Sequence, residues 1–396
     1  MKEWWLVWAG AVVLAGGLAA ACSSSGAESG SGGAAGDGGA AGVGGVGGEA
    51  APPGTLLSYE PRAALGMQLW TVRYTSRGID GTPIEVTGMV AAPMEEPEAG
   101  VRDVVTFAHG TTGISDPCAP STRPLSSDFL NAATVALGAG YVVTATDYEG
   151  LGTPGLHPYY VRESEGRSVI DIVRAARQLE EASSGSRAVV WGNSQGGHAA
   201  LSTGEVAPQW APDVELLGVA AGAPGSELPM AFVEGPGAEG ARGYLWEMTL
   251  GFEEDYPGLS IDDIYEPDVL STIRDLVDME ACNGEFLNVA RPVENAGFAT
   301  NPVDLPEWLP VLEENSPGNV RSEMPILLIQ GSEDLVVRQR YSDALFERLC
   351  ATGSMTDYRV IEGSGHAAFR EVLPAVLEWT NARFAGEAAV DGCPPP

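Results

Sequence analysis

Residues 188–198 read Ala-Val-Val-Trp-Gly-Asn-Ser-Gln-Gly-Gly-His, and the rest of the chain can be placed around them. An apolar, β-branched run leads into Gly-Asn-Ser-Gln-Gly at 192–196, and a helical pattern follows from Ala199. This order of strand, sharp turn and helix is typical of a nucleophile elbow, in which a serine hydroxyl is exposed at the C-terminal edge of a sheet. Such a pattern also arises by chance in a glycine-rich chain, but the flanking strand and helix favour the elbow and Ser194 as its nucleophile.

The size and charge of the chain limit the classes of protein to which it can belong. Its 396 residues suffice for one large α/β domain with an insertion, or for two domains. Its 54 acidic and 21 basic residues give a formal net charge of −33. Nucleic acid is therefore excluded as a partner, and an anionic membrane surface would repel the folded part.

The N-terminus has the pattern of an export signal. An apolar run from Trp4 to Ala21 ends in small residues before Cys22, which predicts a signal peptide over residues 1–22. The stretch 18–22, Leu-Ala-Ala-Ala-Cys, resembles a bacterial lipobox, in which Cys22 would be lipidated. A soluble secreted form and an uncleaved membrane anchor are the alternatives. We therefore expect an exported protein, either a cell-envelope lipoprotein or a secreted one.

A spacer and four further cysteines follow the signal. Residues 23–54 are almost wholly Gly, Ala and Ser, a composition typical of a flexible linker. The cysteines at 118, 282, 350 and 393 form an even set, which predicts two disulfides in an oxidising compartment, with three connectivities open. Their spacing does not suggest a structural metal site.

From residue 55 onward, strand-like stretches alternate with helical ones, which predicts an α/β fold with a mainly parallel sheet and helices on both faces. Two alternating stretches, 66–74 and 84–90, predict an antiparallel pair at the edge of the sheet. Further strands are expected at 101–107, 141–146, 188–193, 216–221 and 325–330, and helices at 128–137 and 169–179.

The alternation lapses between Gly225 and Glu323, where prolines, helical fragments and scattered aromatic residues replace it. We interpret residues 225–320 as an inserted cap over the elbow, and residues 55–224 with 321–396 as the core. Most of the aromatic residues are expected to pack the cap's own helices.

A serine nucleophile needs an imidazole to take its proton, and the chain has only four histidines. His109 and His157 precede the serine, whereas the chain order in this kind of fold is serine, acid, histidine. His198 lies one helical turn after the elbow and is expected to be structural. His366, in a glycine-rich loop, is therefore the predicted general base.

The acid is expected in a loop that follows a strand downstream of the serine. Asp334 meets this condition after the apolar stretch 325–330, with Glu333 as its local rival. Asp147 also follows a strand, but it precedes the serine, and it is expected to brace its own turn. Asp334 would orient the histidine and stabilise the imidazolium.

Two backbone N–H groups are needed to stabilise an oxyanion. Gln195, which follows the nucleophile, is predicted to supply one of them. The second is expected from the loop after the strand at 101–107, where Gly110 allows the backbone to turn. Thr111 is the first candidate there, and Thr112 is the second.

The chain resembles the secretory lipase family, the α/β-hydrolases related to Candida-type lipase A. The resemblance depends on Asp-Pro-Cys-Ala-Pro-Ser at 116–121, on Asp-Tyr-Glu-Gly-Leu-Gly at 147–152, and on the contexts of Ser194, Asp334 and His366. It extends from residue 55 to residue 393.

The resemblance implies a carboxylic ester hydrolase with an α/β-hydrolase core, a helical cap over an acyl pocket, and no cofactor or metal. It also implies disulfides Cys118–Cys282 and Cys350–Cys393. Fungal members lack His109-Gly110 in the oxyanion loop, which indicates a bacterial branch.

We therefore expect hydrolysis of lipid or small-molecule esters through an acyl-enzyme on Ser194, by a monomer that meets membranes only through its lipid anchor. Peptide cleavage or acyl transfer by the same residues is an alternative. A tethered, non-catalytic surface-binding protein is a second one.

Overall fold

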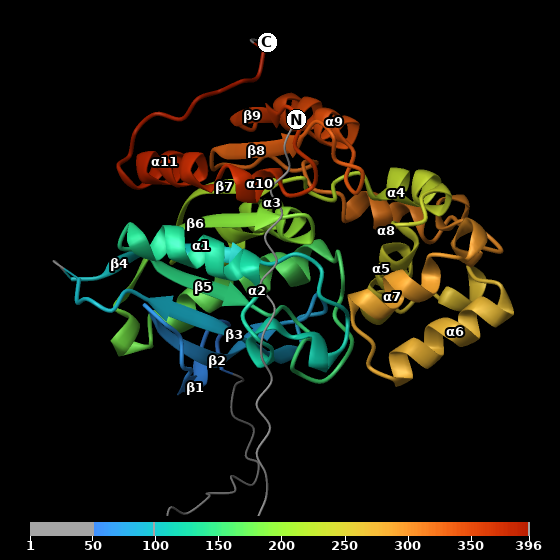
Figure 1. The fold of residues 1–396 in the computed structure, drawn as a ribbon, viewed down its shortest axis with the longest axis horizontal. Coiled ribbons are helices and arrows are strands. Elements are labelled where there is room, and N and C mark those ends of the chain that lie inside the picture. Colours follow the sequence, from blue (N-terminus) through green and yellow to red (C-terminus); the bar gives the residue numbers. More distant parts are fainter. Residues whose placement is uncertain (1–50, 98–99, 395–396) are drawn as a thin grey trace, which may run out of the picture. The chain divides into compact units, whose positions relative to one another are not determined.

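The structure, a computed structural model, describes residues 51–97 and 100–394. The predicted signal peptide, and the predicted linker up to residue 50, lie outside the described residues. Nine strands of the described part form one sheet, in the order β1-β2-β3-β5-β4-β6-β7-β8-β9 (Figure 1). The strands are β1 (Leu56–Pro61), β2 (Gln68–Arg77), β3 (Pro83–Ala92), β4 (Arg102–Ala108), β5 (Val142–Thr146), β6 (Ser184–Asn193), β7 (Glu215–Gly222), β8 (Ile326–Gly331) and β9 (Thr356–Ile361).

Most of the sheet is parallel, as predicted. Strand β4 pairs in parallel with β5 and β6, and the parallel pairing continues through β7 and β8 to β9. The pairs β1–β2, β2–β3 and β3–β5 are antiparallel. The carboxyl ends of the parallel strands therefore meet along one edge of the sheet, where α/β proteins bind their ligands.

The sequence-based prediction missed both outermost strands, β1 and β9. The antiparallel pair expected at the edge of the sheet is β2–β3. Strand β1 lies outside this pair, so the predicted edge position of the pair is wrong. Five of the six residues of β1 are exposed, and β9 is mostly half-buried. Edge strands with so little burial carry no apolar run to mark them.

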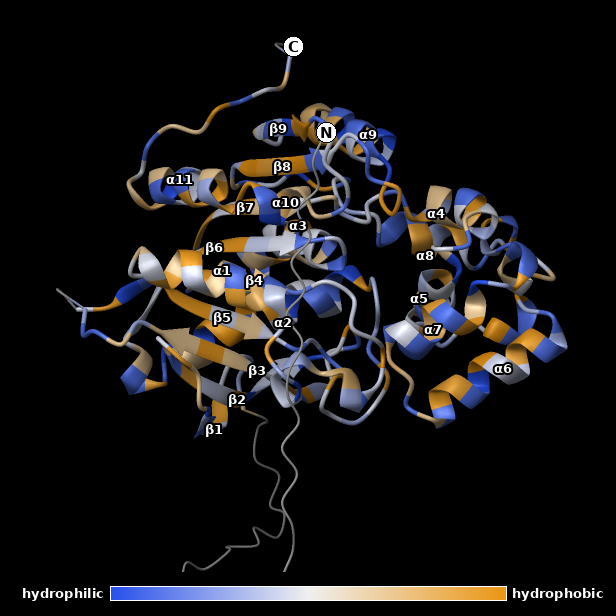
Figure 2. Cartoon of the chain, viewed as in Figure 1, coloured by the Kyte–Doolittle hydropathy of each residue, from blue (hydrophilic) through white to orange (hydrophobic). Residues whose placement is uncertain are grey.

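Helices cover both faces of the sheet and enclose two apolar layers. One face carries α2 (Arg162–Ala176), α3 (Gln195–Trp210) and α9 (Gln339–Thr352). The other carries α1 (Ser127–Gly138), α10 (Ala368–Glu371) and α11 (Leu373–Phe384). Figure 2 shows the central strands as the apolar part between these helices. A sheet covered on both faces explains the nearly continuous apolar runs of its strands.

Five α-helices are inserted between β7 and β8 and group to one side of the sheet (Figure 1). They are α4 (Leu228–Glu234), α5 (Arg242–Asp255), α6 (Pro267–Asp278), α7 (Asn283–Ala290) and α8 (Leu309–Glu314). Trp246, Phe286 and Trp308 are fully buried in a core of their own. The scattered aromatic residues of this segment thus pack mainly with one another. No helix in the described part is both long and apolar enough to span a membrane.

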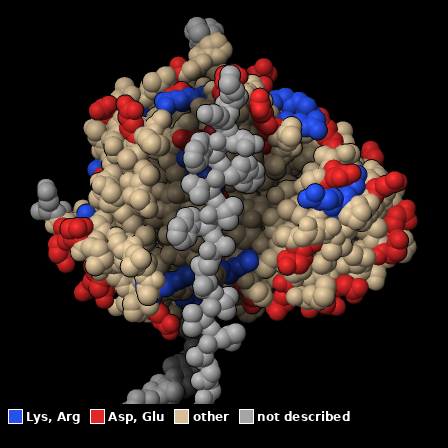
Figure 3. All heavy atoms as spheres, in the orientation of Figure 1, with Lys and Arg blue, Asp and Glu red and all other residues tan. Residues whose placement is uncertain are grey.

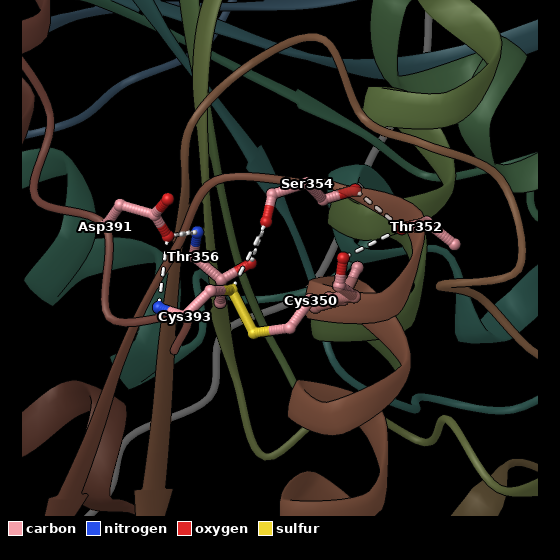
Figure 4. Close-up of a disulfide and its surroundings, with 7 residues drawn as sticks. Cys350, Thr352, Ser354, Thr356, Asp391 and Cys393 are labelled. Atoms are coloured by element: carbon pink, nitrogen blue, oxygen red, sulfur yellow. Dashed lines mark hydrogen bonds between the residues drawn. A yellow bond between two sulfur atoms is a disulfide. The ribbon is translucent and has the colours of Figure 1, made fainter. Parts of the chain in front are cut away.

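Two disulfides in the described part link distant segments, with the pairing that the family resemblance implies. Cys118–Cys282 ties the loop after β4 to the N-terminus of α7. Cys350–Cys393 ties α9 to the C-terminal segment, where the Asp391 carboxylate accepts hydrogen bonds from the backbone N–H groups of Thr356 and Cys393 (Figure 4). Each bond closes a long loop, which favours the folded chain by restricting the unfolded one.

Candidate active site

Ser194 lies between the end of β6 and the start of α3 with φ 62° and ψ −123°. A side chain in this region of backbone space is strained, and such strain persists only where the surroundings enforce it. The Ser194 N–H donates to the Gly222 carbonyl on β7 at 2.9 Å, and the Ser194 carbonyl accepts from His198 at 3.1 Å. Strand and helix therefore hold the turn on both sides.

The glycines of this turn are required by contacts with backbone atoms. A Cβ atom at Gly192 would collide with the Gly196 carbonyl, and one at Gly196 would collide with the carbonyl of Ala108 at the end of β4. One at Gly197 would lie 2.6 Å from the Gly222 carbonyl oxygen. The sequence pattern thus records how closely α3 approaches three neighbouring strands.

Asp334 and His366 are brought together from two loops at the same edge of the sheet. Asp334 follows β8 and is only 4% exposed, and its Oδ2 atom lies 2.8 Å from the His366 Nδ1 atom. Its Oδ1 atom accepts from the backbone N–H groups of Val336 at 2.8 Å and Val337 at 3.0 Å. These bonds fix the carboxylate, so the proton of the histidine is directed to Nδ1 and Nε2 is left free.

The two rival acids lie elsewhere. Glu333 is exposed. Asp147 is fully buried and accepts from the Ser121 N–H at 2.8 Å and the Thr87 hydroxyl at 2.7 Å. Asp147 therefore fixes the segment after β5 against its neighbours, the bracing role expected of it.

The histidine loop is attached directly to the elbow. The Asn193 side-chain amide donates to the His366 carbonyl at 3.2 Å, one residue before the predicted nucleophile. Ser194 and His366 also line the same cavity of about 760 Å³. The structure thus brings all three predicted residues of the triad to one edge of the sheet.

The predicted oxyanion loop lies against the elbow. A Cβ atom added at Gly110 would be 3.9 Å from the Ser194 Cβ atom. The Thr111 hydroxyl bonds the Tyr159 hydroxyl at 2.6 Å, while the Thr112 hydroxyl is buried without a partner in the described part. The backbone N–H groups of Thr111 and Gln195 have no hydrogen-bond acceptor among the described residues, so both are free to bind an incoming oxygen.

The Gln195 side chain is held by a buried polar network that was not part of the sequence-based prediction. Its amide nitrogen lies 2.9 Å from the Glu165 Oε1 atom and 2.7 Å from the His157 Nε2 atom. The Glu165 Oε2 atom lies 2.6 Å from the His198 Nδ1 atom, and the His198 Nε2 atom lies 2.9 Å from the Asn315 carbonyl oxygen. His198 is fully buried, in keeping with the structural role predicted for it.

His157 takes part in this network as a neutral imidazole. Burial is the main reason why its pKa falls to about 4. Its Nδ1 atom bonds the Glu149 carbonyl at 2.9 Å, so its Nε2 atom is left to accept from the Gln195 amide. Burial also lowers the pKa of His109, whose Nδ1 atom lies 2.8 Å from the Gly110 carbonyl oxygen. Neither histidine is therefore a substitute for His366 as the base.

Glu165 escapes the sequence-based prediction, although the sequence contains a signal for it. It lies four residues before Val169, which places a carboxylate on the apolar face of α2. Charged side chains are rarely buried without a partner. A charged residue on the buried face of a helix near the elbow therefore indicates a polar network.

Two cavities meet at Ser194, and among the described residues only Ser194 and Tyr244 line both of them. The larger, of about 760 Å³, contains His366, Thr111 and polar side chains such as Asn283. The smaller, of about 80 Å³, runs under α4 and α5 and is lined mainly by apolar groups. Its apolar lining residues include Leu228, Ala231, Leu245, Met248, Leu335, Val336 and Val337.

Basic groups lie at the larger cavity in an otherwise acidic protein. Figure 3 shows acidic side chains around the margin of the visible face and basic ones beside the hollow near its middle. Arg123 and Arg370 line the larger cavity, and Arg370 pairs with Asp128 at 2.8 Å. No group of three or more His, Cys, Asp or Glu side chains in the described part could hold a metal ion.

Comparison with known proteins finds similar lipases. A family model described as secretory lipase matches residues 127–278. A protein named as a probable inactive lipase of Mycobacterium tuberculosis is 24% identical over 336 residues, which cover 80% of this chain and 74% of that protein. Lipase 6 of Candida albicans is 23% identical over 354 residues, which cover 82% of this chain and 74% of that lipase. Among solved structures, lipase A of Candida antarctica matches with a TM-score of 0.75 at 16% identity, over 86% of this chain and 84% of that chain.

These findings confirm the predicted resemblance and the predicted α/β-hydrolase fold. Family and fold together support ester hydrolysis, and a family of secretory lipases supports export. The bacterial branch stays a prediction.

Proposed function

From the match of residues 127–278 to the secretory lipase family model, we propose that the chain belongs to this family and hydrolyses carboxylic esters through an acyl-enzyme formed on Ser194. The observation that carries the proposal is the meeting of a strained serine and an aspartate-bound histidine at one cavity. A histidine held by a carboxylate at Nδ1 keeps Nε2 free to take the serine proton.

In the proposed reaction, His366 accepts the Ser194 proton as the hydroxyl attacks the ester carbonyl. The backbone N–H groups of Thr111 and Gln195 stabilise the oxyanion, and Asp334 stabilises the imidazolium. His366 then returns the proton to the departing alcohol oxygen. A water molecule, activated by the same histidine, releases the acid from the acyl-enzyme. Loss of one oxyanion donor costs about 3 kcal/mol in such reactions.

Replacement of the nucleophile is the direct test. We expect Ser194→Ala to lower kcat for p-nitrophenyl butyrate about a thousandfold or more, because no acyl-enzyme forms. Ser202→Ala is a matched control, since Ser202 lies on the same helix, fully buried, and its hydroxyl has no partner in the described part. Undiminished hydrolysis by the Ser194 variant would contradict the proposal.

Two alternatives use the same scaffold differently. Peptide cleavage or acyl transfer would share the three residues, and comparing turnover of peptide amides with that of esters separates them. A non-catalytic binding protein is the second, and one similar mycobacterial protein is named as a probable inactive lipase. Labelling of Ser194 by a fluorophosphonate probe excludes it, because only an activated serine reacts.

The remaining expectations belong to the same proposal. Residues 1–22 would direct export, Cys22 would carry the lipid, and residues 23–54 would act as the spacer. Residues 225–320 would form the cap over the two cavities, and the enzyme would act as a monomer on ester substrates without a cofactor.

A further inference from the structure

The two cavities at Ser194 differ about tenfold in volume, about 80 Å³ against about 760 Å³. An ester bound at Ser194 has two arms, the acyl chain and the alcohol, and each must enter one cavity. The Tyr244 side chain lines both cavities, as Ser194 does. The assignment of arms to cavities therefore decides which esters fit.

The position of His366 makes this assignment. The histidine must deliver its proton to the oxygen of the departing alcohol, so that oxygen must lie on the histidine's side of Ser194. His366 lines only the larger cavity. The alcohol therefore occupies the larger cavity, and the acyl chain enters the smaller one.

The smaller cavity limits the length of the acyl chain. Its space of about 80 Å³ compares with about 760 Å³ for the larger cavity. The longer arm of an ester therefore fits better in the larger cavity, and a long acyl chain is disfavoured in the smaller one.

Charged and polar side chains border the outer end of the smaller cavity. Glu234 on α4 accepts from the Arg340 guanidinium and the Tyr341 hydroxyl at the start of α9, and it lies 3.7 Å from Arg338. Glu234, Arg338 and Tyr341 all line the cavity. The Glu234 and Arg338 side chains are 24% and 44% exposed, so this cluster of contacts lies at the surface.

We propose that this site selects esters of short acyl chains with large alcohols, and that the Glu234 contacts set the upper limit of acyl length. The proposal rests on the ester hydrolysis proposed above. It predicts that the rate of hydrolysis depends on whether the acyl part or the alcohol part of the ester is the larger one. Total size and hydrophobicity of the substrate are then secondary.

Two isomeric esters test this directly. Dodecyl butanoate and butyl dodecanoate have the same formula, and only the position of the long chain differs. We expect kcat/KM of the purified enzyme to be about tenfold higher or more for dodecyl butanoate than for butyl dodecanoate. The reason is that a long acyl chain makes fewer favourable contacts in the smaller cavity. Faster hydrolysis of butyl dodecanoate, or equal rates, would overturn the proposal. Hydrolysis of neither ester, nor of p-nitrophenyl butyrate, would overturn the proposed function as well.

The role of the Glu234 contacts is tested with Glu234→Ala. Removal of the carboxylate should open the outer end and raise the ratio of dodecanoate to butanoate hydrolysis by about tenfold. Asp262→Ala is the matched control, because it removes an exposed ion pair with Arg274 elsewhere in the inserted segment. An unchanged ratio in the Glu234 variant, or the same rise in the control, would overturn the role of Glu234.

Discussion

The α/β core and the inserted segment differ in how closely other atoms approach their glycines. At the elbow, each glycine is fixed by a backbone atom of a neighbouring element, as at Gly192, Gly196 and Gly197. In the inserted segment, Gly237, Gly240, Gly258 and Gly284 would meet nothing within 4 Å of an added Cβ atom. The elbow thus holds the reacting groups in one arrangement, whereas these four positions of the inserted segment leave room for a side chain. Within the insert, Gly243 and Gly251 are exceptions, because a Cβ atom there would meet backbone atoms of Leu287 and Tyr159.

A few contacts join the two regions beside the site. The Cys118–Cys282 disulfide and the hydrogen bond from the Asn283 N–H to the Thr112 carbonyl, 3.1 Å long, attach α7 to the oxyanion loop. The bond between His198 and the Asn315 carbonyl attaches the end of the insert to α3. The inserted segment can therefore shape the substrate cavities without carrying the residues of the triad.

The largest effect is expected from a substitution at the closest backbone contact of the core. Gly196→Ala should abolish ester hydrolysis and destabilise the protein by about 3 kcal/mol or more, because its Cβ atom meets the Ala108 carbonyl, which cannot move without shifting β4. Gly258→Ala, in the inserted segment, should change stability by about 0.5 kcal/mol or less. Urea unfolding followed by circular dichroism measures both. Similar losses in the two variants would remove the contrast between the regions.

A smaller effect is expected where the two regions are joined. Glu165→Ala leaves the Gln195 amide and the His198 ring without their shared partner, and it should lower kcat about tenfold while KM changes little. The cause is the mispositioning of the Gln195 N–H group, a donor that acts only in the transition state. Glu165 is thus a positioning residue.

The conservative variant separates positioning from folding. Glu165→Gln keeps an oxygen that can accept from the Gln195 amide and from the Tyr160 N–H, so it should recover most of the lost kcat. A fall in KM and kcat together in the alanine variant, or no recovery in the glutamine variant, would speak against this role. Thermal unfolding of both variants shows whether they are folded.

The last two effects concern the dependence of stability on pH, which differs in sign between the two regions and leaves the native structure near neutral pH unchanged. The pKa of buried His157 falls to about 4 from 6.5, so unfolding takes up a proton between these values. Its contribution to stability is complete above pH 6.5 and declines by about 3 kcal/mol as pH falls to about 4. His157→Gln should therefore flatten the dependence of stability on pH in this range.

Asp255 on α5 is the counterpart in the inserted segment. Burial is the main reason why its pKa rises from 3.8 to about 8, so its cost to stability grows as pH increases between these values. Asp255→Asn should gain stability relative to the natural protein over this range, opposite in direction to the effect of His157. Tm measured at a series of pH values checks both, and slopes of equal sign would contradict the assignment.

The sequence alone determined the parts of this protein that depend on local chemistry. The turn around Ser194 needs glycine on both sides, the buried strands need apolar runs, and only His366 follows the serine at a distance. The even set of cysteines after Cys22 likewise indicated two disulfides. Edge strands β1 and β9 have no apolar run in the sequence, because few of their side chains are buried.

Only the tertiary structure decided which side chains meet across the chain. It brought the Asp334 carboxylate to His366 and left Glu333 exposed, a choice that depends on how the loop after β8 turns. It joined Glu165 to Gln195 from a different helix, and it set the volumes of two cavities on either side of Ser194. These features follow from the packing of elements far apart in the chain, and no local pattern of residues specifies that packing.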